Sequence, residues 1–235
     1  MLISGFIKNS LIDFPGKISS VIFTQGCNLR CKFCHNYELI PRGLQEEDVF
    51  LEVEVLQYLE RSRRLIDALV ITGGEPCLQP DLVQFIRKVK DMGLKVKLDT
   101  NGTDPGKLEY LLEQNLVDYV AMDVKAPLDL MAYRKLVGDQ FSRNAMARVK
   151  ASIELIKNSE IPYEFRTTLI RECHPQEHIR TICNQLKGAR KYTLQQFAPE
   201  KVLDQSFALY SGYDCSDLEE LKSQDADLIE EIHII

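Results

Sequence analysis

The sequence lacks several features that would assign it to a particular class of protein. Its 235 residues include 29 Lys and Arg against 35 Asp and Glu, so the net charge is −6 and there is no basic excess for binding nucleic acid. No uncharged apolar run approaches the roughly 18 residues that span a bilayer. The first residues also lack the basic head and apolar stretch of a secretion signal. We therefore expect a cytoplasmic protein whose partners are neither nucleic acids nor membranes.

Linkers, repeats and low-complexity segments are also missing. Apolar residues make up 45% of the chain and charged residues 27%, which is ordinary for a globular protein. We expect one domain over residues 1–235, with its core at about 19–197. A short N-terminal lead would precede this core, and an acidic tail over 214–235 would follow it as a helix.

Short segments rich in β-branched residues alternate with segments of helical periodicity. The expected strands are 19–24, 68–72, 95–99, 119–124, 163–169 and 191–197. The expected helices are 46–59, one that opens at Pro80 and Asp81 and ends before Gly93, 107–114, 144–157 and 176–186. Such alternation is typical of βαβ units with a parallel sheet. Six units indicate either an open doubly wound sheet or an incomplete barrel.

Polar residues follow every expected strand, at the end where ligands bind in parallel α/β folds. They include a cysteine-rich loop after the first strand, Gly73-Gly74-Glu75-Pro76 after the second and Asp99-Thr100-Asn101-Gly102 after the third. The remaining strands carry Asp123 and Lys125, then Arg166, then Gln195 and Gln196. Chance would distribute such residues over both ends, so this end of the sheet is the expected site.

The seven cysteines are an odd number, and a reducing compartment disfavours disulfides. Cys27, Cys31 and Cys34 lie in one loop with the spacing C-x3-C-x2-C. Three interpretations are open: an iron–sulfur cluster with one iron left free, a zinc site, or reactive or structural thiols. His35 directly follows Cys34 and is a poor fourth zinc ligand. Ligand softness and spacing favour the cluster.

These motifs resemble those of a known superfamily. With Phe33, the cysteines form C-x3-C-x-aromatic-C, which is similar to the signature of radical S-adenosylmethionine (radical SAM) enzymes, and residues 73–76 resemble their second motif. The segments 34–36, 99–102 and 123–125 resemble the glycyl-radical-enzyme activases. Residues 10–17 and 23–27 resemble the family of anaerobic ribonucleoside-triphosphate reductase activating proteins. The likeness covers about residues 3–197, and we expect a partial (β/α)6 TIM-like barrel with parallel strands, open on one side.

The resemblance also implies a site. Cys27, Cys31 and Cys34 would be the metal ligands and the reactive centre, each holding one iron of a [4Fe–4S] cluster, with S-adenosylmethionine on the fourth iron. The residues implied to bind that cofactor are Phe33, His35, Gly73, Gly74, Glu75, Asp99, Thr100, Asn101, Asp123, Lys125 and Arg166. A monovalent cation would lie near Asp99 and Asp123. For two of these residues a second role stays open. Arg166 would pair with a barrel acid instead of binding the cofactor, and Glu75 would hold its own loop.

The implied activity is a one-electron reaction. The reduced cluster would cleave S-adenosylmethionine, and the resulting radical would take a hydrogen atom from a glycine of a partner anaerobic ribonucleoside-triphosphate reductase. A flavodoxin- or ferredoxin-type protein would donate the electron. The alternatives are a radical enzyme acting directly on a small molecule, similar to 7-carboxy-7-deazaguanine synthase, an activase of a different glycyl-radical enzyme, or a zinc-binding interaction module.

The sequence departs from the activase pattern in one place. The pyruvate formate-lyase activases have a histidine on the last barrel strand, where this chain has Gln195 and Gln196. The other cysteines, Cys77, Cys173, Cys183 and Cys215, are isolated, so we expect a single cluster. The cysteines and histidines at 173, 174, 178 and 183 fit no zinc spacing, and packing is the simpler role for them.

Overall fold

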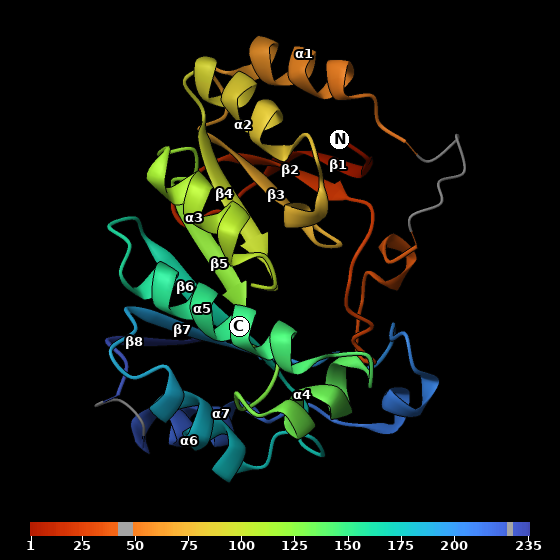
Figure 1. Ribbon diagram of the computed structural model, residues 1–235, viewed down its shortest axis with the longest axis vertical. Helices are drawn as coiled ribbons and strands as arrows, with labels where there is room; N and C mark the ends of the chain where they lie inside the picture. Colours follow the sequence, from red (N-terminus) through yellow and green to blue (C-terminus); the bar gives the residue numbers. More distant parts are fainter. Residues whose placement is uncertain (42–48, 225–227) are drawn as a thin grey trace. The chain divides into compact units, whose positions relative to one another are not determined.

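The computed structural model describes residues 1–41, 49–224 and 228–235. Its strands form one open sheet in the order β1-β2-β3-β4-β5-β6-β7-β8 (Figure 1). The chain divides into two compact units. Unit 1 comprises Met1–Asn28, Glu38–Thr100 and Gly106–Val120, and unit 2 comprises Leu29–Tyr37, Asn101–Pro105 and Ala121–Ile235. The single domain expected over the whole chain stays a prediction.

Unit 1 contains the first four strands. β1 (Ile3–Ser10) pairs antiparallel with β2 (Ser19–Thr24), whereas β2, β3 (Ala68–Gly73) and β4 (Lys95–Thr100) run parallel. Between them lie the helices α1 (Glu52–Ser62) and α2 (Leu82–Asp91) and the short 3₁₀ helix η3 (Pro76–Leu78), with α3 (Pro105–Glu113) after β4.

Helix α2 shows how the sequence pattern becomes packing. Leu82, Phe85, Ile86 and Val89 recur at helical spacing, and all four are fully buried. Each contributes about 1.5–3 kcal/mol by leaving water. Lys88 and Lys90 lie in the last turn, where cations favour the helix dipole.

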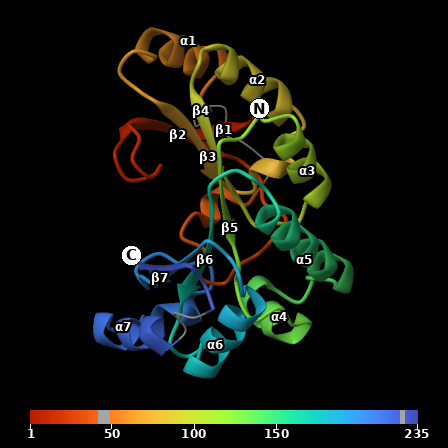
Figure 2. The ribbon, with the colours of Figure 1, turned by 90° about the vertical axis from the view of Figure 1, so that its left-hand side faces the viewer.

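Unit 2 contains the later strands. β5 (Tyr119–Asp123) runs across the boundary of the two units, and β6 (Tyr163–Leu169), β7 (Lys191–Gln196) and β8 (Glu231–Ile234) are parallel to one another. The helices are α4 (Leu130–Val137), α5 (Arg143–Lys157), α6 (Gln176–Gln185) and α7 (Cys215–Gln224). Two 3₁₀ helices are η4 (Gln205–Leu209) and η1 (Tyr37–Leu39), and η1 begins at the boundary of the two units. Figure 2 shows α6 and α7 side by side.

Side-chain caps fix where two helices of unit 2 begin. Asp129 opens α4 by accepting hydrogen bonds from the backbone N–H groups of Met131 and Ala132. Ser142 opens α5 in the same way, with its Oγ 3.1 Å from the backbone nitrogen of Ala145. The expected helix 144–157 therefore begins one residue earlier, at Arg143.

The expected fold class, an α/β fold with an open sheet of parallel strands, is confirmed. The prediction that the whole tail is helical is wrong at the C-terminal end of the chain. Residues 215–224 form α7, but 231–234 form the edge strand β8. Ile232 is buried while its neighbours Glu231 and His233 are exposed, and this alternation suits a strand. The sequence analysis also missed β1 and α4.

The expected helix 46–59 is correct only in part. Residues 46–48 lie outside the described residues. Val49, Phe50 and Leu51 are not helical, because the backbone of Phe50 pairs with that of Ile3 at the edge of the sheet. The helix runs from Glu52 to Ser62. None of the described helices is long and apolar enough to cross a bilayer.

Candidate cofactor and cluster site

The backbone before the first cysteine is held against the loop after β3. The N–H of Gly74 donates to the carbonyl of Thr24 at 2.8 Å, and the N–H of Glu75 donates to that of Gly26 at 2.8 Å. A Cβ on Gly74 would lie 2.2 Å from the Gly26 carbonyl oxygen, and Gly73 has φ +109°. Both positions therefore require glycine for close approach of two backbones. Cys27 directly follows this contact.

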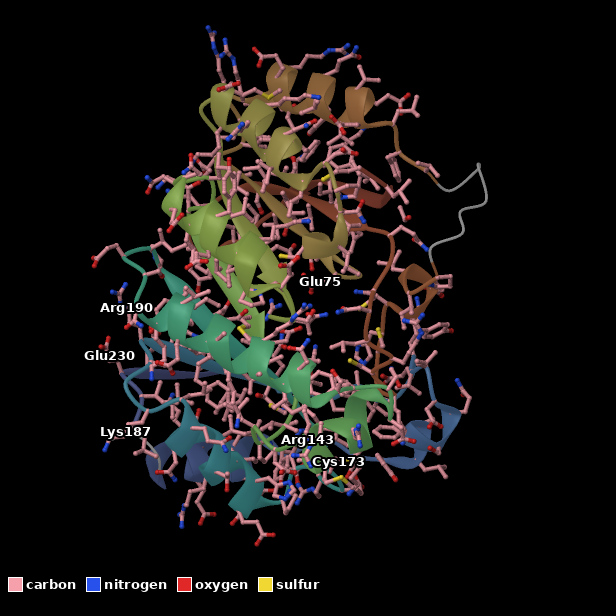
Figure 3. The ribbon with its side chains drawn as sticks, in the orientation of Figure 1. Glu75, Arg143, Cys173, Lys187, Arg190 and Glu230 are labelled. Atoms are coloured by element: carbon pink, nitrogen blue, oxygen red, sulfur yellow. The ribbon has the colours of Figure 1, made fainter. Side chains whose placement is uncertain are left out.

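Glu75, labelled in Figure 3, is buried and holds the loop after β3 through the contacts of its carboxylate. Its Oε1 accepts hydrogen bonds from the backbone N–H of Cys77 at 3.0 Å and from the Thr100 hydroxyl at 2.8 Å. This carboxylate thus caps η3 and ties it to the end of β4. Of the two roles left open for Glu75, holding its own loop is the one that these contacts show.

The residues at the end of β4 and just after it are divided between the two units. In unit 1, Asp99 forms an ion pair with Lys97 at 3.5 Å. In unit 2, the side-chain oxygen of Asn101 accepts from the backbone N–H and the hydroxyl of Thr103, at 3.0 and 2.6 Å. Ser152 on α5 donates to the Gly102 carbonyl at 2.8 Å, which fixes this turn against the helix.

The later part of the cysteine loop is anchored in unit 2. The N–H groups of Arg30 and Lys32 donate to the carbonyls of Val137 and Leu136, at the end of α4. The N–H of Cys34 donates to the carbonyl of Cys31 at 3.0 Å, which closes a tight turn. The sequence analysis missed α4, and with it this anchor.

Asp123 and Lys125, at the end of β5 and just after it, form a charged cluster with Arg166 in the middle of β6. The Lys125 Nζ lies 2.7 Å from Asp123 Oδ2, and the Arg166 Nε lies 3.0 Å from Asp123 Oδ1. Burial would raise the pKa of Asp123, but the two cations outweigh it and lower the pKa to about 2. Of the two roles left open for Arg166, pairing with an acid is the one observed.

Aromatic and thiol groups accompany this cluster in unit 2. The Phe33 ring is buried, with the Lys125 Nζ 5.8 Å from its centroid. His35 is exposed, and its ring centroid lies 6.2 Å from that of Phe197. Burial raises the pKa of the Cys34 thiol, against the opposing effects of a backbone hydrogen bond from Asn36 and the charge of Lys125. Lys125 favours the thiolate form, and Lys201 does so more weakly.

Gln195, rather than Gln196, shares a sheet face with Arg166. In the parallel pair of β6 and β7, Arg166 is the partner of Thr193 and Thr168 is the partner of Gln195. Side chains alternate along a strand, so Gln195 faces the same side as Arg166. Gln196 points to the opposite side. The register therefore favours Gln195 as the residue in place of the late-strand histidine.

Two groups that hold Lys125 were not identified as site residues in the sequence. The Nδ1 of His174 accepts the N–H of Ile170 at 3.1 Å, and its Nε2 then donates to the Lys125 carbonyl at 2.9 Å. The Tyr133 hydroxyl accepts the N–H of Lys125 at 3.2 Å, and burial raises the pKa of this hydroxyl. The sequence showed His174 only as one of a group with Cys173, His178 and Cys183, whose spacing fits no zinc pattern and for which packing is the simpler role.

The donor chemistry of the cysteine motif fits an iron–sulfur cluster. In the part of the chain that the structure describes, none of Cys27, Cys31 and Cys34 is in a disulfide. Cys31 is buried and the other two are partly exposed. Three soft sulfur donors in one loop suit iron–sulfur ligation. Over the described ranges, no three His, Cys, Asp or Glu side chains are assembled as a metal site. The ligand assignment therefore depends on spacing and donor type.

The comparisons with known proteins agree with one another. The model of the radical SAM superfamily matches residues 21–182. A protein of Methanocaldococcus jannaschii, named as a candidate glycyl-radical enzyme activating enzyme, is 37% identical over 215 residues, which are 88% of this chain and 84% of the relative. The pyruvate formate-lyase-activating enzyme of Clostridium pasteurianum is 29% identical over 199 residues, covering 82% of this chain and 79% of that enzyme.

A solved structure supports the fold. The crystal structure of Streptococcus suis SuiB bound to S-adenosylmethionine superposes with a TM-score of 0.69 at 16% identity. The match covers 92% of this chain and 49% of SuiB, so this chain spans about half the length of that protein. Because the family model matches residues 21–182 and the archaeal relative is 37% identical over most of the chain, this chain belongs to the radical SAM superfamily and is a radical SAM enzyme.

Proposed function

We propose that this chain is the activase of an anaerobic ribonucleoside-triphosphate reductase and removes a hydrogen atom from a glycine of that enzyme. The observation that carries the proposal is the 37% identity to a candidate glycyl-radical enzyme activating enzyme over 88% of this chain. The stretches 10–17 and 23–27, which resemble the reductase activating proteins, support the choice of partner.

In this proposal Cys27, Cys31 and Cys34 hold a [4Fe–4S] cluster. When bound, the cluster and S-adenosylmethionine supply the one-electron chemistry. The protein holds the thiol loop at two places, which the contacts of Gly26 and of Lys32 support. The turn that the Cys31 carbonyl and the Cys34 N–H close keeps two of the three thiols on one short segment.

The charged cluster of unit 2 would bind the methionyl carboxylate of the cofactor. Asp123 carries one negative charge, whereas Lys125 and Arg166 carry two positive charges. Within this cluster, two positive charges accompany one negative charge. Asp123 fixes both cations in place, so their positions are set before the ligand arrives. His35, exposed beside Phe197, and the buried Phe33 offer aromatic faces for the adenine.

The loops of unit 1 would receive the cofactor through backbone groups. Gly73 and Gly74 carry no side chains that would obstruct a ligand, and Glu75 and Thr100 hold each other rather than reach outward. Asn101 fixes the following turn. In this proposal these residues shape the site, and none of them acts as a general acid or base. A flavodoxin- or ferredoxin-type protein would deliver the electron.

The test is an anaerobic reconstitution of the purified chain with iron and sulfide. The protein is then mixed with S-adenosylmethionine, a reductant and a candidate anaerobic reductase. We expect cofactor cleavage and a doublet glycyl-radical signal in the electron paramagnetic resonance spectrum of the reductase. The matched control replaces the buried Cys183, which lies on α6 away from the motif, by Ala and should retain both signals.

Two outcomes would redirect the proposal. A radical on pyruvate formate-lyase but not on the reductase would keep the activase and change the partner. Cofactor cleavage with turnover of a small molecule, and no radical on either enzyme, would overturn the activase in favour of direct action on a small substrate.

A further inference from the structure

Lys97 is a buried lysine in the middle of β4, in unit 1. Its side chain is 6% exposed, and its Nζ lies 2.6 Å from the Asp13 carbonyl oxygen and 3.5 Å from Asp99 Oδ1. The ring centroid of Tyr119 is 5.7 Å away. Carbonyl and carboxylate oxygens are also the ligands that hard metal cations take. The ammonium group of Lys97 therefore occupies surroundings suited to a single positive charge.

The position of Lys97 follows from the strand and from a rigid turn. Residues 97 and 99 are two apart on β4, so their side chains lie on the same face. The Ser10 hydroxyl accepts the N–H groups of Ile12 and Asp13 at 3.3 Å, which fixes the turn that presents the Asp13 carbonyl. Phe14, next in the chain, is buried against the ring of Tyr119.

In unit 2, both carboxylate oxygens of Asp123 already pair with cationic side chains. Lys125 binds one of its carboxylate oxygens and Arg166 binds the other. A metal ion added there would meet two resident positive charges. The residues present thus do not fit the monovalent cation that the family resemblance implies near Asp99 and Asp123.

We propose that the ammonium group of Lys97 replaces this cation at Asp99, so that the protein binds its cofactor without Na⁺ or K⁺. The proposal rests on the proposed function, together with the family resemblance that places Asp99 among the cofactor-binding residues. The charge beside Asp99 is then part of the fold and does not vary with the salt of the cell.

The first experiment measures thermal unfolding of the cluster-free chain in NaCl, KCl and choline chloride at equal ionic strength. The wild type should have the same midpoint in all three salts. Lys97→Met leaves Asp99 without its ammonium partner, and its midpoint should fall by about 10 °C in choline chloride. It should recover part of this loss in NaCl or KCl.

Two variants control this result. Lys95→Met removes an exposed lysine from the same face of the same strand, and its midpoint should match that of the wild type in every salt. The double variant Lys97→Met/Asp99→Asn has neither charge, so it should regain stability and lose the response to Na⁺ and K⁺. It keeps the test decisive if Lys97→Met alone is unfolded.

The second experiment measures S-adenosylmethionine affinity and cleavage by the reconstituted enzyme in the same salts. The wild type should be unaffected, and Lys97→Met should be weakened at least ~10-fold in choline chloride and recover in NaCl or KCl. Stabilisation or activation of the wild type by Na⁺ or K⁺ would overturn the proposal, as would a Lys97→Met variant that responds no differently from Lys95→Met. Absence of cleavage in every salt would refute the proposed function, while the unfolding data would still decide the role of Lys97.

Discussion

His174 makes the stability of this protein depend on pH between neutrality and pH 4. It is fully buried, and its Nδ1 accepts the N–H of Ile170 while its Nε2 donates to the Lys125 carbonyl. Only the neutral ring can do both, because a protonated Nδ1 cannot accept. Burial lowers the pKa of His174 from 6.5 to about 4, although the hydrogen bond to the Lys125 carbonyl acts in the opposite direction.

The direction of this pH dependence follows from how many protons the folded and unfolded chains bind. Between pH 6.5 and about 4, the unfolded chain binds a proton at His174 and the folded chain does not. The contribution of His174 to stability is therefore fully present above pH 6.5 and is lost as the pH falls towards 4. The difference in pKa corresponds to about 3 kcal/mol in total, of which about 2 kcal/mol is lost between pH 7 and pH 5.

The measurement is urea unfolding of the cluster-free chain at pH 7 and pH 5. His174→Gln removes the titration and keeps an amide that donates to the Lys125 carbonyl. Its loss of unfolding free energy between the two pH values should be smaller than that of the wild type by about 2 kcal/mol. Titrating groups distant from His174 contribute equally to the pH dependence of both proteins, and their effects cancel. His233→Gln, on the exposed face of β8, should behave like the wild type. Equal losses for His174→Gln and wild type would refute the reasoning.

Three further changes test the site. Cys31→Ala should abolish the absorbance of the reconstituted cluster and cofactor cleavage together, and retained cleavage would contradict the ligand assignment. Gly74→Ala places a Cβ 2.2 Å from the Gly26 carbonyl and should lower the unfolding free energy by about 2–4 kcal/mol in urea titrations, whereas an unchanged midpoint would show that the two loops separate freely. Arg166→Met leaves Asp123 with one cation, so the pKa of Asp123 should rise in carboxyl-resolved NMR titrations. Cofactor affinity should fall about tenfold. A pKa of Asp123 that stays at its wild-type value would assign the shift to Lys125 alone.

Local patterns predicted the sheet well. Runs of β-branched residues gave the strands 19–24 and 163–169 with the bounds that the structure has. The period of two also placed Asp123 and Lys125 on one side, and they form an ion pair. β8 has only four residues, too few for an alternating pattern to be distinguished from the end of an amphipathic helix.

The partners of the buried ionic and imidazole groups were not predictable in the same way. Lys97 is held by the carbonyl of a residue 84 positions earlier in the chain, and His174 by that of a residue 49 positions earlier. Such contacts are set by how strands and loops pack, and no local period reports them. A lysine two residues before Asp99 on a strand was visible in the sequence, but it also fits an exposed strand face.

The contact of Gly74 and Glu75 with Thr24 and Gly26 has a consequence for how this enzyme can be altered. The two hydrogen bonds extend the ladder of β2 and β3 beyond the last residues of the strands. These hydrogen bonds therefore fix the register of the residues before Cys27, as in a pair of strands. We expect substitutions of outward-facing side chains nearby to be tolerated, whereas inserting or deleting a single residue between Thr24 and Cys27 would shift the register and displace the thiol.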